Sequence, residues 1–378
     1  MPHWNVQNDY LEITEMPFYW RLNTTAEAFQ NIATRLPVTL KVNSQFDYLE
    51  LDWQEKDWAH VERAYMQDAN IGFINPESGQ MDTYGSSVNN FFLNIINSIK
   101  PKKIFEIGCG AGFSIKYLAE NGWQVVGVDP SEYSYHWSQK LGFELLNTFF
   151  DSETFDTEVD FIYCNDVFEH IRDVHTFAKN VFKALNAGGT FCFSTTNSTE
   201  SIAIGDISMI EHQHVNMFTE RSIYSILISA GFGNINIGKS SYGNTFHVTA
   251  QKATTKRQHE IPAMSCDGYF SRAASKIQAF ADFYARVQGH CNFYVPLRCI
   301  PYLATVGDFG KHNIYDSNTS WHGKYIDGYA LPISLLSEKN KKCNEHYFIG
   351  SMTFFDEIKK SLISKGISPY LIQGVKDL

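Results

Sequence analysis

Three glycines within five positions constrain the fold of this 378-residue chain more than any other feature. Gly108, Gly110 and Gly112 follow the apolar run KIFEI at 103–107 and precede FSIKYLAENG at 113–122, whose apolar residues have helical spacing. A glycine-rich turn between a strand and its helix lets a ligand touch backbone N–H groups at the positive end of the helix. The pattern therefore predicts a ligand held against the backbone at one edge of a parallel sheet.

Apolar runs and helical patterns alternate after these glycines. Strands are expected at QVVGV, FELLNTFF, DFIYC and TFCFSTT, and helices between them at SEYSYHWSQKLG and VHTFAKNVFKALNAGG. NINIG and TFHVTAQK, which a short polar turn separates, are expected to form a final antiparallel hairpin. Strands that alternate with helices predict a parallel sheet with helices on both faces. The expected fold class is therefore α/β, with a Rossmann-like doubly wound sheet.

The sequence outside this alternation predicts further units. We expect a helical N-terminal cap over 1–95, the main domain over 96–253, a linker with an amphipathic helix over 254–299, and a second, smaller α/β domain over 300–378. The cap includes VNNFFLNIINSI, which has helical spacing. In the last unit, YLATVG, HYFIGS and SPYLI are expected strands, and FFDEIKKSLISKG is an expected helix.

Charge and cysteine content narrow the class of protein. The net charge of −10 argues against a nucleic-acid partner, which needs basic patches that neutralise phosphates. The seven cysteines form no CxxC pair, which predicts a reducing compartment without disulfides or a structural zinc ion. The N-terminal residues do not follow the pattern of a secretory signal, and no apolar stretch is long enough to span a bilayer. We expect a cytoplasmic protein that binds neither nucleic acid nor membranes; the sequence leaves its oligomeric state open.

Two classes of cofactor use a glycine turn of this kind. The dinucleotide fingerprint is G-x-G-x-x-G, whereas this chain reads G-x-G-x-G and has Phe113 where the last glycine would stand. Asp129 ends the second strand, where a carboxylate can accept both hydroxyls of a ribose. Because both classes share an acidic residue at that position, Asp129 does not separate a nicotinamide-dependent dehydrogenase from the other class.

The sequence resembles the class I S-adenosylmethionine-dependent methyltransferases. Their motif, an acidic residue, an apolar residue and G-x-G-x-G, is matched by Glu106, Ile107 and residues 108–112. DFIYCNDVFEHIRD at 160–173 is similar to their fourth strand and the EH turn after it, and LNAGGTFCFSTTN at 185–197 is similar to their fifth strand. The resemblance covers about residues 80–250 and implies a seven-stranded core that binds S-adenosylmethionine.

The resemblance assigns roles to residues of this chain. It implies that Gly108 and Gly110 admit the methionine part of the cofactor. It also implies that Glu106 orients the loop or binds the cofactor's amino group, and that Asp129 holds the ribose hydroxyls. The other expected cofactor-binding residues are Cys109 and Gly112 in the loop, Pro130 beside Asp129, Asn165 and Asp166 on the floor of the site, Phe150 and Asp151 beside the adenine, and Tyr84 as a lid over the methionine end.

A histidine-rich stretch, MIEHQHVNMFTERSIYSILISAGF, supplies the candidate catalytic residues. His212 and His214 are two residues apart, so they face the same way if the segment is extended. The stretch is similar to one in the C-methyltransferases that act on nucleotide-linked deoxysugars. Glu211 replaces a tyrosine of that pattern and Gln213 replaces a glutamate, whereas His214 keeps its place.

The C-terminal region resembles the same subgroup. GDFGKHN, IYDSNTSWHGKYIDGYALPI and HYFIGSMTFFDEIKKSLISKG are similar to its C-terminal α/β domain. No cysteine precedes Cys109, so the N-terminal zinc site of the subgroup is missing. The resemblance implies a small polar acceptor, a nucleotide-linked sugar of polysaccharide or natural-product synthesis, and it leaves C- and O-methylation open.

A base near the donor would take the proton of the acceptor as the methyl group moves. His214 is the candidate general base, with Glu211 tuning it and His212 beside it. These three residues could instead bind a metal ion, but no further ligand is evident nearby, and we expect no metal. His170 in the EH turn is expected to lie behind the reacting groups. The alternatives left open are an O-methyltransferase of another small metabolite, a nucleic-acid methyltransferase and a non-catalytic cofactor-binding protein.

Overall fold

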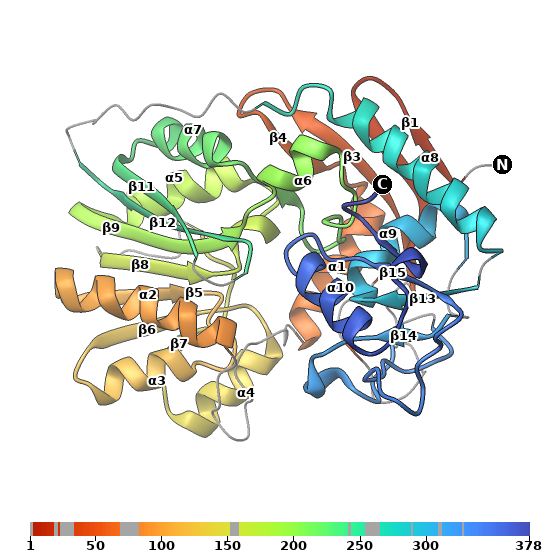
Figure 1. Ribbon diagram of the computed structural model, residues 1–378. Helices are drawn as coiled ribbons and strands as arrows, with labels where there is room; N and C mark the ends of the chain where they lie inside the picture. The colour runs from red at the N-terminus through yellow and green to blue at the C-terminus, as the bar shows by residue number, and fades with distance from the viewer. Residues whose placement is uncertain are drawn as a thin grey trace.

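The computed structural model describes residues 3–18, 22, 34–68, 83–151, 159–240, 243–253, 265–288, 290–308, 312–326 and 329–378. These residues form two lobes (Figure 1). One lobe holds the predicted main sheet and its helices, and the other combines the N-terminal and C-terminal parts of the chain. None of the helices in these ranges has both the length and the hydropathy that a bilayer crossing needs.

The main sheet has seven strands in the order β11-β12-β9-β8-β5-β6-β7. Neighbours from β7 to β9 are parallel, and β12 pairs antiparallel with both β9 and β11. This arrangement confirms the α/β prediction and its final hairpin, although the predicted strand FELLNTFF is reduced to the two residues of β7. The strands are β5 (Lys103–Ile107), β6 (Gln124–Val128), β7 (Leu145–Leu146), β8 (Val159–Asn165), β9 (Leu185–Thr196), β11 (Gly233–Lys239) and β12 (Thr245–Gln251).

Helices cover both faces of this sheet. They are α2 (Thr83–Ile99), α3 (Phe113–Glu120), α4 (Glu132–Leu141), α5 (Val174–Ala184) and α7 (Glu220–Ala230). α2 and α3 share a core with Ile104, whereas α5 and α7 share a core with Phe105, the next residue of β5. Successive side chains of a strand point to opposite faces, so one strand supplies both cores.

The strand order reverses between β5 and β8. From β5 the chain continues to β6 and β7 on one side, and it then returns to β8 and β9 on the other. Open α/β sheets bind their ligands outside the carboxyl ends of the strands at such a reversal. The glycine loop follows β5 directly, and Asp166 follows β8, so both lie at this position.

The N-terminal region contains a sheet, which corrects the helical cap predicted over 1–95. Its four strands pair antiparallel, and β10 from the histidine-rich stretch joins the sheet beside β4. The period of two is visible in β3, where Leu36, Val38 and Leu40 are buried. Only α1 (Glu55–Asp68) and α2 are helical in this part of the described chain. The strands are β1 (Trp4–Val6), β2 (Tyr10–Pro17), β3 (Arg35–Asn43), β4 (Tyr48–Leu51) and β10 (Asn216–Met217).

The C-terminal region holds a second, parallel sheet in the order β14-β13-β15-β16. The strand predicted at YLATVG is wrong, because that run lies in α9 (Pro296–Val306), and the missed strand β13 (Cys291–Tyr294) precedes it. The predicted helix at FFDEIKKSLISKG is confirmed as α10 (Phe355–Ser364), and residues 254–264 of the predicted linker lie outside the described residues. The remaining elements are α8 (Tyr269–Arg286), β14 (Ile314–Tyr315), β15 (His346–Ile349) and β16 (Ile372–Gly374).

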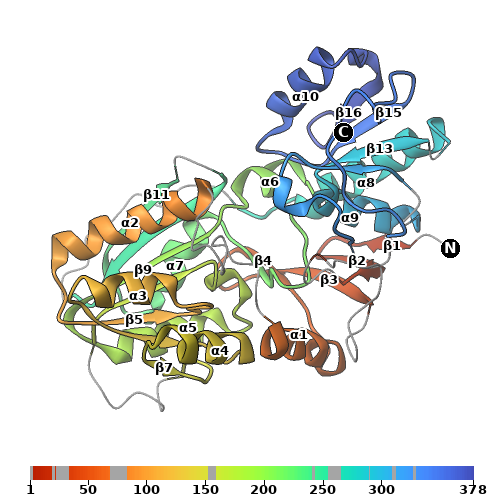
Figure 2. The ribbon, with the colours of Figure 1, turned by 90° about the horizontal axis from the view of Figure 1, so that it is seen from below.

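One hydrophobic core runs through the second lobe. It joins Leu40 of β3, Phe280 of α8, Leu303 of α9 and Phe348 of β15. Figure 2 shows α8 and α9 between the N-terminal and C-terminal sheets. The predicted boundaries after residues 95, 253 and 299 stay a prediction, but the N-terminal and C-terminal sheets pack as one body.

Candidate active site

Backbone hydrogen bonds hold the glycine loop against the end of the sheet. Gly108, Gly110 and Gly112 have φ values of 69°, 51° and 68°, in the left-handed region that favours glycine. The Gly108 N–H donates to the carbonyl of Val128 over 2.8 Å, and the Gly112 N–H donates to the carbonyl of Cys109 over 2.9 Å. The loop is therefore anchored to the end of β6 and leads directly into α3.

Only one of the three glycines opens onto free space. A Cβ on Gly108 would lie 2.4 Å from Cγ2 of Val167, and one on Gly112 would lie 2.1 Å from the ring of Phe143. A Cβ on Gly110 would meet no atom within 4 Å. Packing within the protein thus accounts for the outer two glycines, and Gly110 is the position where a ligand can approach the backbone.

Asp129 is buried at the end of β6, with 5% of its surface exposed. One carboxylate oxygen accepts hydrogen bonds from the Ser131 N–H (2.9 Å) and hydroxyl (2.6 Å), and the other accepts from the Gly110 N–H (3.0 Å). The Asn147 amide donates to the Asp129 carbonyl over 2.9 Å. Each carboxylate oxygen has two lone-pair directions, so the oxygen that accepts from Gly110 can still accept one further hydrogen bond, as from a ribose hydroxyl. Ser131 and Asn147 were not among the predicted site residues.

Glu106 lies under the loop and faces Tyr163, whose hydroxyl donates to it over 2.8 Å. Burial raises the pKa of Glu106 to about 8, and the nearby Asp129 carboxylate acts in the same direction. The neighbouring Cys109 thiol is also buried, and burial raises its pKa, so it is not a thiolate nucleophile. Glu106 is suited to receive a cationic group, because a cation would offset its buried charge.

Asp166 follows β8 in a left-handed conformation, with φ of 48°. The Tyr84 hydroxyl, in the first turn of α2, donates to Asp166 over 2.9 Å and accepts from Thr245 over 3.3 Å. Asn165 accepts a hydrogen bond from Ser194. The structure therefore brings the predicted residues Tyr84, Asn165 and Asp166 together at the ends of β8, β9 and β12.

The remaining predicted cofactor residues lie near the end of β7. Pro130 follows Asp129 directly. Phe150 packs edge-to-face on Phe177 with ring centroids 5.7 Å apart, and Asp151 is exposed. Residues 152–158 lie outside the described residues. The adenine contact proposed for Phe150 and Asp151 stays a prediction.

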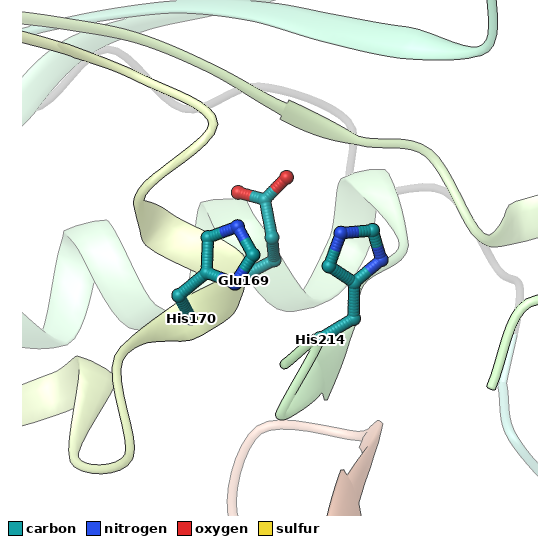
Figure 3. A group of neighbouring side chains, drawn as sticks. All are labelled: Glu169, His170 and His214. Atoms are coloured by element: carbon teal, nitrogen blue, oxygen red, sulfur yellow. The ribbon is translucent and has the colours of Figure 1, made fainter. Parts of the chain in front are cut away.

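His214 lies with Glu169 and His170, and one ligand atom from each of the three residues is within 4.8 Å of the others (Figure 3). Glu169 is fully buried and accepts from the Thr195 hydroxyl (2.9 Å) and the Thr196 N–H (3.3 Å). Burial raises the pKa of Glu169 and lowers the pKa values of both imidazoles, which are therefore neutral near pH 7. The EH turn thus supplies two partners of His214 that the predicted catalytic set did not include.

His212 does not face the same way as His214. The Nε2 atom of His212 lies 3.1 Å from the Leu36 carbonyl, and its ring packs against Phe18 and Trp53. Burial lowers the pKa of His212 to about 4. The chain bends between the two histidines, with the His214 N–H donating to the Glu211 carbonyl over 3.2 Å, so the extended geometry that we expected is absent. His212 is a core residue of the second lobe.

Glu211 links the two lobes. Its carboxylate binds the Arg298 guanidinium of α9 over 2.6 Å and lies 3.9 Å from Nε2 of His214. Burial alone would raise the pKa of Glu211, but Arg298 and the histidines outweigh burial, and the pKa lies below its ordinary value. Arg298 was not among the predicted site residues.

A cavity of about 100 Å³ lies between the lobes beside His214. The lobe that holds the main sheet contributes Asn197 and Ser198, which follow β9, and Asn244, which precedes β12. The other lobe contributes Arg298 and the segment 350–353 after β15. Asn244 precedes Thr245, the partner of Tyr84, so the cavity lies one residue along the chain from the hydrogen bonds that join Tyr84 to Thr245 and Asp166.

The comparisons with known proteins agree with this geometry. Residues 82–237 match a family model described as a methyltransferase domain. The ubiquinone biosynthesis O-methyltransferase of Hydrogenovibrio crunogenus is 30% identical over 114 residues, which cover 28% of this chain and 47% of that protein. Phosphoethanolamine N-methyltransferase 1 of Zea mays is 27% identical over 170 residues, which cover 42% of this chain and 33% of that protein. The chain spans about half the length, or less, of these curated relatives.

One solved structure is similar to part of this chain. The plantazolicin methyltransferase BpumL in complex with SAH aligns with a TM-score of 0.37 and 16% identity, over 44% of this chain and 83% of that one. The family-model match therefore lies on the region where the sequence resembles a methyltransferase domain. The relatives named above are O- and N-methyltransferases, so the resemblance to the nucleotide-sugar C-methyltransferases stays a prediction.

Proposed function

We propose that this chain transfers the methyl group of S-adenosylmethionine to a hydroxyl oxygen of a small polar acceptor bound between the lobes. The observation that carries the proposal is the cavity beside His214, which is lined by Asn244 next to the Tyr84 partner Thr245 and by Arg298 from the other lobe. The donor supplies an activated methyl carbon, and the protein aligns the acceptor oxygen and handles its proton.

The donor is held at the reversal of the sheet. Gly110 offers open backbone, Asp129 offers acceptors for the ribose, and Glu106 offers a buried carboxylate for the amino group. Tyr84 closes the methionine end through its bond to Asp166. These roles fit the residues present, since each carries the donor or acceptor that the cofactor needs.

The acceptor lies against polar side chains. Asn197, Ser198 and Asn244 line one wall of the cavity, and Arg298 and Ser351 line the other. Hydroxyl, amide and guanidinium groups suit an acceptor with several oxygens, and a nucleotide-linked sugar is the first class to test. An oxygen nucleophile is favoured over carbon because the tyrosine and glutamate of the C-methylating pattern are replaced by Glu211 and Gln213.

In this proposal His214 takes the acceptor proton. Its ring lines the cavity, and burial lowers its pKa, so the neutral imidazole can accept a proton at neutral pH. The Glu211 carboxylate, 3.9 Å from Nε2, favours the imidazolium that forms. His212 takes no part, because its ring is bonded in the core.

The test combines cofactor binding with methyl transfer. Calorimetry of the purified chain should give saturable heat with S-adenosylhomocysteine and none with NADH. Methyl transfer from radiolabelled S-adenosylmethionine is then measured with nucleotide sugars, phenols and RNA as separate acceptors. His214→Ala should reduce the rate of methyl transfer by about 10²-fold or more. The affinity for S-adenosylhomocysteine should stay unchanged. The exposed His136 of α4 provides the control variant, His136→Ala.

Three outcomes would contradict the proposal. No heat with S-adenosylhomocysteine removes the cofactor assignment. Cofactor binding without transfer to any acceptor indicates a non-catalytic protein. Transfer that His214→Ala does not slow removes His214 from the mechanism.

A further inference from the structure

We propose that Glu169, His170 and His214 bind a divalent transition metal ion of the zinc type, with open coordination positions that face the acceptor cavity. The three residues come from two separate segments, the turn Phe168–His170 after β8 and the bend before β10. The sequence predicted no metal, and the set that it considered contained Glu211 and His212. The structure assigns a different set.

The donor atoms converge on one point. One ligand atom from each residue lies within 4.8 Å of the others, so small side-chain rotations bring all three onto one ion at about 2.0–2.2 Å. Figure 3 shows both imidazole rings and the carboxylate turned toward a common space. His212 is excluded from the set because its Nε2 is bonded to the Leu36 carbonyl.

Hydrogen bonds behind the cluster hold the ligands in a metal-binding form. Nδ1 of His170 lies 2.6 Å from the Gln213 carbonyl, which can only accept, so Nδ1 carries the hydrogen and Nε2 presents its lone pair to the cluster. Glu169 is held by the Thr195 hydroxyl and the Thr196 N–H. Metal-binding histidines characteristically donate their second ring nitrogen to a carbonyl or carboxylate, and ligating carboxylates are themselves hydrogen-bonded.

The charge around the cluster calls for a cation. Glu169 and Asp166 are neighbouring carboxylates, and among the described residues neither has a Lys or Arg partner in an ion pair. Arg298, the nearest guanidinium of the cavity, is paired with Glu211. Unpaired carboxylates away from water are costly, and a divalent ion between Glu169 and the two neutral rings would remove that cost.

The ligand set points to the class of metal. Two imidazoles and one carboxylate with a free position match catalytic zinc sites and other borderline divalent metals, whereas calcium and magnesium prefer oxygen ligands alone. His214 lines the cavity, so an acceptor in the cavity approaches the cluster from the His214 side.

The chemical role of the ion rests on the proposed function. An acceptor hydroxyl bound to the metal loses its proton to cavity water more easily. The O–CH₃ bond then forms as the S–CH₃ bond of the donor breaks. When the metal is bound, His214 is one of its ligands and does not act as the base. The metal then activates the acceptor hydroxyl, which a base would have to do in the metal-free enzyme.

The site is tested on the full-length chain, first stripped with a chelator and without any methyl donor. Titration with Zn²⁺ should show one tight site per chain, and Co²⁺ should give the visible d–d bands of a site with nitrogen ligands. Glu169→Gln, His170→Ala and His214→Ala should each weaken Zn²⁺ binding by about 10-fold or more. His136→Ala, which removes an exposed imidazole, should leave the affinity unchanged. Circular dichroism of each variant shows whether it folds.

The outcomes separate this site from the proposed function. Equal Zn²⁺ affinity in all variants, or no uptake at micromolar metal, overturns the site even if methyl transfer proceeds. Zn²⁺ uptake that depends on the three residues supports the site even if no methyl transfer is found. Full methyl transfer by the stripped enzyme in the presence of chelator overturns the role of the metal in activation and leaves the general-base role of His214.

Discussion

At the scale of single residues, the three glycines of the loop are required for different reasons. Gly108 and Gly112 would place a Cβ against Val167 and Phe143, whereas Gly110 faces open space. A sequence pattern cannot make this distinction, because all three positions are glycine. Their φ values are all positive and do not separate them either. The distinction predicts that substitutions at the three positions fail for different reasons.

Gly110→Ala should weaken cofactor binding more than it weakens the fold. A Cβ at φ of 51° costs roughly 1–2 kcal/mol of conformational strain but meets no atom of the protein within 4 Å. Gly142→Ala, with φ of 73° and the same open surroundings at the end of α4, is the matched control. Both variants should lose similar unfolding free energy in urea, and only Gly110→Ala should lose at least about tenfold in S-adenosylhomocysteine affinity. Equal affinities would show that no ligand approaches this backbone.

Glu106→Gln should change how stability depends on pH. The folded chain holds a proton on Glu106 up to about pH 8, whereas the unfolded chain releases it near its ordinary value of 4.5. The unfolding free energy of the wild type therefore falls as pH rises through this window, because the folded state binds more protons. The neutral glutamine removes this contribution and can still accept from Tyr163.

Urea denaturation near pH 5 and near pH 8, without cofactor, measures the effect. The variant should gain on the order of 3 kcal/mol relative to the wild type between the two pH values. Parallel stability profiles would show that Glu106 is ionised in the folded chain.

The sequence located some site residues and missed others for identifiable reasons. Asp129 and His214 stand next to strong local patterns, a strand end and a histidine-rich stretch. Glu169 was visible in the EH turn, but its meeting with His214 depends on how two distant segments fold together. Arg298 could not be found, because it reaches Glu211 from a helix that the sequence analysis did not predict.

At the scale of elements, the alternating core was predictable and its surroundings were not. In the main sheet each strand is followed or preceded by a helix whose end is marked in the sequence. Each apolar run there can therefore be assigned to a strand without ambiguity. YLATVG is short and apolar, and Leu303 and Ala304 are buried throughout, so its letters fit a strand as well as a buried helix. In β3, Leu36, Val38 and Leu40 alternate with less buried residues, a strand pattern that the helical cap expected over 1–95 did not take into account.

Gly205→Ala tests the contact between α6 (Thr199–Ile204) and α8. A Cβ on Gly205 would lie 2.5 Å from the backbone nitrogen of Ala273 and 2.5 Å from the carbonyl carbon of Arg272, and φ is 73°. Backbone cannot move aside as a side chain can, so overpacking of roughly 1–3 kcal/mol adds to a strain of roughly 1–2 kcal/mol. The urea midpoint should fall by an amount equivalent to about 3 kcal/mol.

The control for this variant is Gly122→Ala, which has φ of 85° and no atom within 4 Å of the added Cβ. It carries the strain without the clash and should lose roughly 1–2 kcal/mol. If both variants lose the same amount, the close approach of α6 to α8 is not present in solution.

At the scale of the whole molecule, the acceptor cavity belongs to neither lobe alone. The carboxyl ends of β9 in the main sheet and of β15 in the second sheet both lead into it. The N-terminal sheet also lies next to the cavity, because β10 begins two residues after His214 and pairs with β4 of that sheet. The second lobe therefore positions the histidine-rich stretch as well as one wall of the cavity.

Arg298→Gln should separate acceptor binding from donor binding. Arg298 reaches the cavity from α9 and binds Glu211 over 2.6 Å, whereas Gly110 and Asp129, the residues proposed to hold the cofactor, lie on the other lobe. Loss of a charge-assisted contact of about 1.5–3 kcal/mol should raise the acceptor KM by roughly tenfold or more and leave S-adenosylhomocysteine affinity within about twofold. Arg286→Gln, which removes an exposed guanidinium on α8, should change neither quantity. A parallel loss of both affinities in Arg298→Gln would mean that the second lobe shapes the donor site, and the acceptor would then have to bind elsewhere.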